Sequence, residues 1–129
     1  KPIPAPKTYI CCVLIIEYPM SAYVSIREEV LEKLQNHLPE LQKRFGIETI
    51  GIFGSVARGD DSESSDVDVL YAFEEGRGDL YEYAHATEYL ETLFGRNIDF
   101  VSIRWMSPHL RKYVEPEMIL FGKDAGATA

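Results

Sequence analysis

The stretch IGIFGSVARGD at residues 50–60, followed by SDVDVL at residues 65–70, decides the fold of this 129-residue chain. Both parts contain an apolar run of the length and composition typical of a buried strand. Gly54 ends the first run, and a backbone without a side chain lets a phosphate approach closely there. The Ser55 hydroxyl and the neighbouring N–H groups can then donate to that phosphate. Asp66 and Asp68 begin the second run.

The two aspartates supply oxygen ligands of the kind that hard divalent cations prefer. Because side chains alternate along a strand, Asp66 and Asp68 are expected to project from the same face. Magnesium in proteins is usually held by one or two carboxylates together with substrate phosphates. Asp99 lies between two apolar residues and is expected to join the pair across the sheet. The pattern favours a two-metal site for phosphoryl or nucleotidyl transfer, with the three aspartates as metal ligands and catalytic residues.

Hydrophobic periodicity predicts an α/β (α+β) fold, in which helices cover a small mixed β-sheet. Pro39 is expected to kink or restart the first helix, and Gly46 to end it. Asp79 and Glu82 are expected to form a reciprocal cap at the start of a later helix. The expected elements are a helix at residues 26–45, a strand at 47–53, a short helical turn at 55–58, a strand at 66–73, a helix at 80–94, a strand at 97–102, a helix from 107 to 114, and one further helical turn within 116–121.

Each half of the opening pattern is weak evidence when taken alone. The Gly-Ser pair would also suit an ordinary strand-ending turn, and the aspartate pair a solvated strand face. An EF-hand beginning at Asp61 fails, because Asp66 would stand where glycine is required and Ala72 where glutamate is required. A phosphate-binding loop ending in Gly-Lys-Ser/Thr and the dinucleotide glycine fingerprint are both absent from the sequence. The two halves together favour nucleotidyl transfer.

Composition narrows the range of functions further. The formal net charge of −8 argues against direct nucleic-acid binding, which depends on Lys and Arg neutralising phosphates. Cys11 and Cys12 are the only cysteines and are adjacent, so we expect no disulfide framework and a reducing, cytoplasmic setting. The apolar run at residues 10–16 is too short to span a membrane, and no membrane association is expected.

The chain is expected to contain a single domain. Residues 1–19 open with a Pro-rich segment unlike the rest of the chain, and they form an N-terminal extension of uncertain origin. Residues 20–122 form the domain, and residues 123–129 a flexible tail. This length leaves no room for a second, acceptor-binding domain, so an acceptor is expected to come from another molecule.

The residues at 53–60 and 65–70 together resemble the signature of the minimal nucleotidyltransferases, within the DNA polymerase β-like superfamily. Residues 93–101 resemble the strand of that family that carries a third aspartate, and residues 110–122 resemble its C-terminal segment. The resemblance implies the nucleotidyltransferase fold and two Mg²⁺ ions held by Asp66, Asp68 and Asp99. It also implies that Gly54 and Ser55 bind the triphosphate of ATP.

Arg58 is a further candidate for nucleotide binding. Its guanidinium group could meet a phosphate with two parallel hydrogen bonds, or it could anchor one of the acidic residues Asp60, Asp61 or Glu63. The residue types favour neither alternative.

Members of the resembled family are commonly antitoxins paired with a HEPN-domain ribonuclease toxin. The resemblance therefore implies transfer of AMP from ATP to a tyrosine hydroxyl of such a toxin, with pyrophosphate as the leaving group. Two alternatives stay open: a noncatalytic antitoxin that acts by binding, and nucleotidyl transfer to a small hydroxyl compound.

Overall fold

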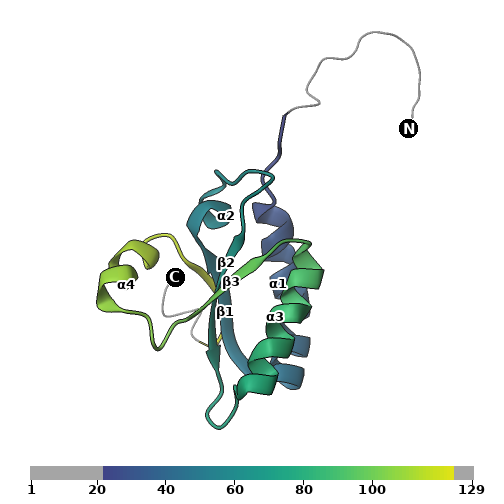
Figure 1. Cartoon of the computed structure of the whole chain (residues 1–129), viewed down its shortest axis with the longest axis vertical. Helices are drawn as coiled ribbons and strands as arrows, with labels where there is room; N and C mark the ends of the chain where they lie inside the picture. Colours follow the sequence, from purple (N-terminus) through teal and green to yellow (C-terminus); the bar gives the residue numbers. More distant parts are fainter. Residues whose placement is uncertain (1–21, 124–129) are drawn as a thin grey trace, which may run out of the picture.

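A four-stranded mixed sheet lies at the centre of the structure, a computed structural model that describes residues 22–123 (Figure 1). The strand order is β3-β2-β1-β4. β1 runs antiparallel to both β2 and β4, whereas β2 and β3 are parallel and are joined by a helical crossover. The strands are β1 (Ile47–Phe53), β2 (Val67–Phe73), β3 (Ile98–Ser102) and β4 (Ile119–Gly122). The mixed sheet and the first three strands confirm the sequence prediction.

Two long helices, α1 (Arg27–Phe45) and α3 (Leu80–Phe94), cover one face of the sheet, and the short helix α4 (Pro108–Val114) lies on the opposite side (Figure 1). α1 and α3 pack against each other over the sheet, while α2 directly follows β1. Gly46 ends α1 in the left-handed conformation, as expected for a helix-ending glycine. The helices are α1 (Arg27–Phe45), α2 (Gly54–Arg58), α3 (Leu80–Phe94) and α4 (Pro108–Val114).

Two expected local features need correction. α1 continues through Pro39 as one helix, with the proline on the exposed side, so the helix does not restart there, whereas the kink stays a prediction. Residues 119–122 do not form a helical turn but the edge strand β4, since they pair with β1 from Ile52↔Ile119 to Thr49↔Gly122. In both places tertiary packing outweighed a local preference.

The α3 cap follows the prediction, with Gly78 as an additional partner. Asp79 accepts a hydrogen bond from the Glu82 N–H (2.8 Å), as expected. The Glu82 carboxylate accepts in return from the Gly78 N–H (2.6 Å), and a backbone hydrogen bond from Asp79 also helps to lower its pKa. The start of α3 is therefore held in both directions.

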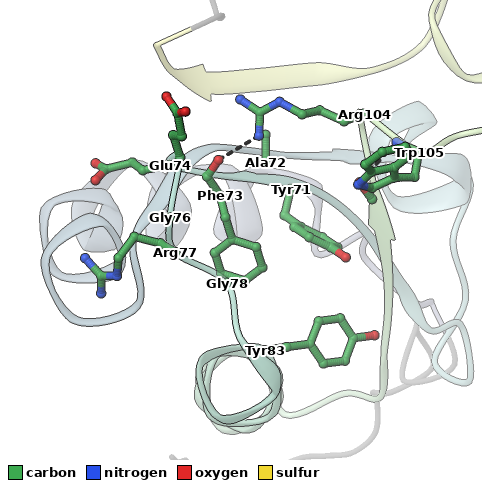
Figure 2. A pocket seen from close by; sticks show the side chains of 12 residues that line it. Tyr71, Ala72, Phe73, Glu74, Gly76, Arg77, Gly78, Tyr83, Arg104 and Trp105 are labelled. Carbon is green, nitrogen blue, oxygen red and sulfur yellow. Dashed lines mark hydrogen bonds between the residues drawn. The ribbon is translucent and has the colours of Figure 1, made fainter.

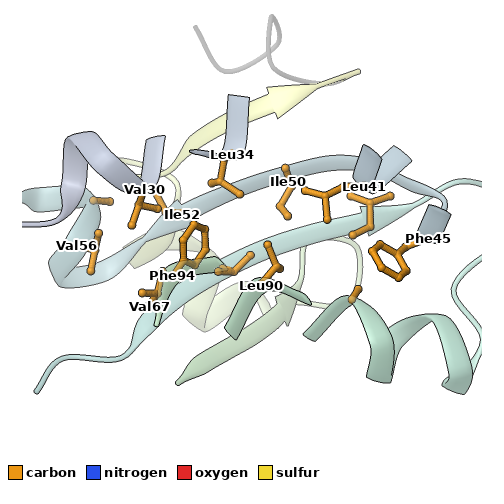
Figure 3. Close-up of a cluster of buried hydrophobic side chains, with 14 residues drawn as sticks. Val30, Leu34, Leu41, Phe45, Ile50, Ile52, Val56, Val67, Leu90 and Phe94 are labelled. Carbon is orange, nitrogen blue, oxygen red and sulfur yellow. The ribbon is translucent and has the colours of Figure 1, made fainter. Parts of the chain in front are cut away.

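The main hydrophobic core lies between the sheet and the α1–α3 layer (Figure 3). Leu34 on α1, Leu90 on α3 and Ile50 on β1 are fully buried there. A smaller cluster on the opposite face contains Leu70 and Val114. Apolar side chains thus pack on both faces of the sheet.

The N-terminal extension expected at residues 1–19, including Cys11 and Cys12, lies outside the described residues, and so does most of the expected tail. The domain boundaries stay predictions. Of the helices within residues 22–123, none combines the length and the apolar composition that crossing a bilayer requires.

Candidate active site

The carboxylates lie where β2 begins. Asp68 is the second residue of β2, and the parallel register places it directly opposite Asp99 on β3. Asp66 immediately precedes the strand and is exposed. Val67 and Val69 point into the main core, so the alternation of side chains turns Asp68 toward the opposite face. The structure therefore brings Asp68 and Asp99 together across the sheet, with Asp66 close along the chain.

Asp68 is the electrostatically strained member of this group. Its side chain is half-buried, whereas Asp66 and Asp99 are exposed. Burial, and then the negative charges of Asp99, Asp66 and Glu117, raise the pKa of Asp68 to about 6, and the Arg58 charge opposes this only in part. Because these negative charges repel one another, a bound cation would stabilise the ionised form of Asp68.

The Gly54–Ser55 turn lies directly against Asp68. Gly54 has a positive φ of 76°, and a Cβ atom built on it would lie 2.1 Å from the Asp68 carboxylate oxygen Oδ2. Only glycine allows the backbone to approach the carboxylate this closely. Within the described residues, no hydrogen bond involves the Ser55 hydroxyl oxygen, so this hydroxyl can donate to a bound phosphate.

Arg58, at the end of α2, contacts two carboxylates. Its Nε donates to Asp60 (3.1 Å), and its Nη1 donates to both carboxylate oxygens of Glu117 (3.0 and 3.2 Å). Asp60 is one of the three anchors considered from the sequence, but Glu117 was not among them. Donating hydrogen bonds to these two carboxylates raises the pKa of Arg58. The guanidinium group is thus held beside the Gly54–Ser55 turn while about half of the side chain stays exposed.

Glu117 is the site residue that sequence reasoning missed. Its Oε2 also accepts a hydrogen bond from the Gly54 N–H (2.7 Å). One signal could have identified it: an acidic residue directly before an apolar run, here residues 118–121, as Asp66 lies directly before the run that begins at Val67. That signal was obscured because residues 116–121 were assigned to a helical turn.

A second missed feature fixes the loop between α2 and β2. Asp61 is buried and accepts hydrogen bonds from the Tyr23 hydroxyl (2.6 Å), the Ser25 hydroxyl and the Ile26 N–H (3.2 Å). Burial raises the pKa of Asp61, but these hydrogen bonds together outweigh it, and the pKa lies below its usual value. Arg96 donates to the carbonyl oxygen of Ser65 (2.9 Å), the residue before Asp66. The loop that carries Asp66 is therefore tied to α1 and to the α3–β3 connection.

The carboxylates fit magnesium better as ligands shared with a substrate than as a closed protein cage. Across residues 22–123, no three or more His, Cys, Asp or Glu side chains form a group that could hold a metal ion by themselves. Asp68 and Asp99, adjacent in register and repelling each other, provide the one or two carboxylates that Mg²⁺ usually combines with phosphates. The assignment of Asp66, Asp68 and Asp99 as ligands of two ions stays a prediction.

An aromatic-lined cavity lies elsewhere on the sheet. A pocket of about 520 Å³ is formed at the last residues of β2, at the far end of that strand from Asp68 (Figure 2). Tyr71 and Tyr83 line it, and Arg104 closes one side by donating to the Phe73 carbonyl (2.6 Å). Trp105 is 88% exposed at its rim. Because the carboxylates are at the other end of the strand, this cavity does not belong to the candidate site.

Known proteins match this chain in sequence and in fold. The profile of the polymerase beta nucleotidyltransferase family matches residues 32–125. The protein adenylyltransferase MntA of Thermococcus cleftensis is 40% identical over 92 residues, which are 71% of this chain and 92% of that protein. A solved structure described as that of a minimal nucleotidyltransferase is 43% identical, with a TM-score of 0.60, over 70% of this chain and 92% of the other.

A more distant match agrees in fold. A toxin–antitoxin crystal structure with AMP-PNP contains a chain that is 20% identical, with a TM-score of 0.55, over 80% of each chain. The resemblance inferred from the two motifs, the fold class and the enzyme class are thus confirmed. This chain belongs to the polymerase β nucleotidyltransferase family and is a nucleotidyltransferase of the minimal type.

Proposed function

We propose that this protein is the antitoxin of a toxin–antitoxin pair and transfers AMP from ATP to a tyrosine hydroxyl of a HEPN-domain ribonuclease toxin. The tyrosine oxygen forms a bond to the α-phosphorus of ATP, and the bond from that phosphorus to the bridging oxygen breaks. Pyrophosphate leaves with the electron pair, and the hydroxyl proton passes to solvent or to a carboxylate of the site. The products are O-AMP-tyrosine and pyrophosphate.

One observation supports this proposal above all: Asp68 and Asp99 lie opposite each other on neighbouring strands, beside the Gly54–Ser55 turn. Phosphoryl-type transfer depends mainly on positioning and charge neutralisation, and a rigid strand pair supplies positions more reliably than a loop does. Mg²⁺, when bound by these carboxylates and the phosphates, would neutralise charge at the α-phosphate and lower the pKa of the attacking hydroxyl.

The remaining groups orient the nucleotide and admit the acceptor. The Ser55 hydroxyl and the Arg58 guanidinium group are donors beside the carboxylates, and donors of this kind bind phosphate oxygens. Asp99 is exposed on β3, which is an edge strand, so an acceptor tyrosine can approach from that edge. Asp66 and Asp99 are exposed, which suits an acceptor as large as a folded protein.

The relatives support a protein acceptor. The MntA relative from Thermococcus cleftensis is named a protein adenylyltransferase, and the matching residues cover 92% of that relative. Fold neighbours with TM-scores of 0.55 are toxin–antitoxin complexes, one of them with AMP-PNP. We therefore propose that this chain, too, takes the adenylyl group from ATP, transfers it to a protein and has a toxin as its partner.

The test is to incubate the protein with labelled ATP, Mg²⁺ and the product of the neighbouring gene, and to measure the intact masses of both proteins. An AMP adduct on the neighbouring protein, mapped to a tyrosine, is expected. Omission of Mg²⁺ should prevent the adduct and serves as the control. A panel of small hydroxyl compounds, assayed for pyrophosphate release, tests the alternative acceptor class.

One result would contradict enzymatic antitoxin action. If co-expression neutralises the toxicity of the neighbouring protein while no AMP adduct forms on it, neutralisation occurs by binding alone. Pyrophosphate release with a small compound but not with the protein would instead identify a small-molecule nucleotidyltransferase.

A further inference from the structure

Glu117 contacts two of the three residues predicted to bind the nucleotide, although nothing in the two motifs points to it. Its Oε2 accepts from the Gly54 N–H at 2.7 Å. Both oxygens of the same carboxylate accept hydrogen bonds from Arg58 Nη1, at 3.0 and 3.2 Å. One carboxylate therefore joins the first and the last residue of α2, and it connects both to the segment that enters β4.

The backbone places this carboxylate rigidly. β4 pairs antiparallel with β1 through Ile52↔Ile119, and continuing this register by two residues brings Glu117 beside Gly54. The N–H groups of Glu117 and Met118 both donate to the Val114 carbonyl oxygen at 3.0 Å. Val114 is buried in the smaller hydrophobic cluster. The Glu117 side chain is only 24% exposed, so the residues packed around it fix its position.

The bonds of Glu117 determine which donors stay available to a phosphate. The Gly54 N–H is directed at Glu117, and of the Arg58 nitrogens Nε and Nη1 are engaged by Asp60 and Glu117. Within residues 22–123 no hydrogen bond uses Arg58 Nη2 or the Ser55 hydroxyl oxygen. These two groups are the side-chain donors of α2 that the arrangement leaves for a phosphate.

The position of Glu117 also has an electrostatic cost. Its negative charge is one of those that act unfavourably on Asp68. A further carboxylate among negative charges destabilises the folded site less when a cation pairs with it. Arg58 is the cation that pairs with Glu117. Glu117 thus adds negative charge to the site while fixing Arg58, whose positive charge partly offsets the repulsion at Asp68.

We propose that Glu117 is a positioning residue for nucleotide binding. It holds the Gly54–Ser55 turn through the Gly54 N–H and holds the Arg58 guanidinium group, so that Ser55 Oγ and Arg58 Nη2 keep fixed positions for the phosphates. This inference rests on the proposed function only as far as nucleotide binding, and it does not depend on which acceptor receives the AMP.

The test compares Glu117→Ala, Glu117→Gln and the wild-type protein. The Kd of a non-hydrolysable ATP analogue with Mg²⁺ is measured by calorimetry, KM and kcat for ATP by pyrophosphate release, and folding by thermal unfolding. Glu117→Ala should raise Kd and KM about tenfold, in line with the loss of one charge-assisted contact, and should lower kcat less. Glu117→Gln should recover part of the affinity, because its amide oxygen can still accept from the Gly54 N–H.

Glu115→Ala is the matched control. Glu115 is exposed, lies two residues away and pairs only with Arg111 among the described residues, so its removal changes the net charge equally without touching α2. Its Kd and KM should equal those of the wild-type protein.

Unchanged affinity in a folded Glu117→Ala protein would show that Glu117 is only structural and would overturn the inference. Tighter binding would also overturn it, because Glu117 would then compete with phosphate for the same donors. If the alanine variant does not fold, the glutamine variant decides between these outcomes. Wild-type protein that binds the analogue but transfers no AMP would refute the proposed transfer alone, whereas wild-type protein that binds no nucleotide would refute both.

Discussion

Among the described residues, Asp68 is the carboxylate whose ionisation the surroundings oppose most clearly. It combines partial burial with three negative neighbours, and Gly54 packs against it from the next strand end. Groups with such perturbed pKa values concentrate at functional sites. The same surroundings make Asp68 a source of instability in the metal-free protein.

The first residue-scale prediction concerns this instability. The folded-state pKa of about 6 lies above the ordinary value of 3.8, so the folded protein holds the Asp68 proton more tightly than the unfolded chain does. The resulting stability is full below about pH 4 and is lost as the pH rises through about 6. Asp68→Asn should therefore stabilise the metal-free protein at pH 8 by about 1 kcal/mol, after allowance for solvent screening.

Urea unfolding at pH 4 and pH 8, in the presence of a chelator, measures this effect. The stabilising effect of Asp68→Asn should be much smaller at pH 4 than at pH 8. A variant that is less stable than the wild-type protein at pH 8 would contradict the electrostatic interpretation.

The second residue-scale prediction concerns catalysis. Replacing Asp66 and Asp68 together by alanine should abolish AMP transfer, because the expected metal ligands on β2 are lost, while the far-ultraviolet circular dichroism spectrum stays native. The control is the double replacement of Glu74 and Glu75, an exposed acidic pair in the turn after β2. Transfer activity retained by the aspartate variant would refute the metal assignment.

At the scale of elements, the loop between α2 and β2 depends on partners distant in sequence. Asp61 accepts hydrogen bonds from Tyr23 and Ser25, which lie 38 and 36 positions earlier, just before α1. Arg96 reaches the loop from the α3–β3 connection and donates to Ser65. The position of Asp66 thus depends on how three elements meet.

This arrangement leads to a prediction for Asp61→Ala. The variant leaves three donors of the α1 start without their acceptor and should lose about 2 kcal/mol of stability. It should also weaken transfer activity, since the loop that carries Asp66 loses its anchor. Chemical denaturation and the AMP-transfer assay measure the two effects. The exposed neighbour Glu63, replaced by alanine, should change neither, and an Asp61→Ala protein of wild-type stability would refute the anchoring role.

At the scale of the whole molecule, the two faces of the sheet are divided between packing and chemistry. α1 and α3 cover one face with the main core. The other face is covered by the smaller cluster around Leu70 and Val114, and the carboxylates lie on that face at the start of β2 and β3. The main core therefore stabilises the strands without burying the site.

The prediction at this scale is that removal of core volume destabilises the entire domain. Leu34 is fully buried between α1 and the sheet, so Leu34→Ala should cost about 2–5 kcal/mol through lost apolar burial and the cavity it leaves. Leu80 is 82% exposed, and Leu80→Ala should change stability by less than about 0.5 kcal/mol. Denaturant unfolding followed by circular dichroism compares the two. Equal effects would show that the main core does not carry the stability of the fold.

Local signals in the sequence were sufficient for much of the structure. Apolar periodicity, glycine stops and polar caps lie within a few residues of the elements they define, which is why α1, α3, α4 and three strands were predicted. The alternation of Asp99 with two apolar neighbours also predicted its approach to Asp68, because strand phase determines the face on which a side chain lies.

Partners far apart in the chain decided the rest. β4 is only four residues long and became a strand because β1 offered it hydrogen bonds, and α1 continues through Pro39 because packing on the sheet stabilises the helix. Glu117 meets Gly54 and Arg58 across 63 and 59 residues, a separation at which no local pattern indicates contact. The sequence by itself determined the chemical groups of the site and their strands; only the tertiary structure decided which charges face one another, because that depends on the register and packing of the assembled sheet.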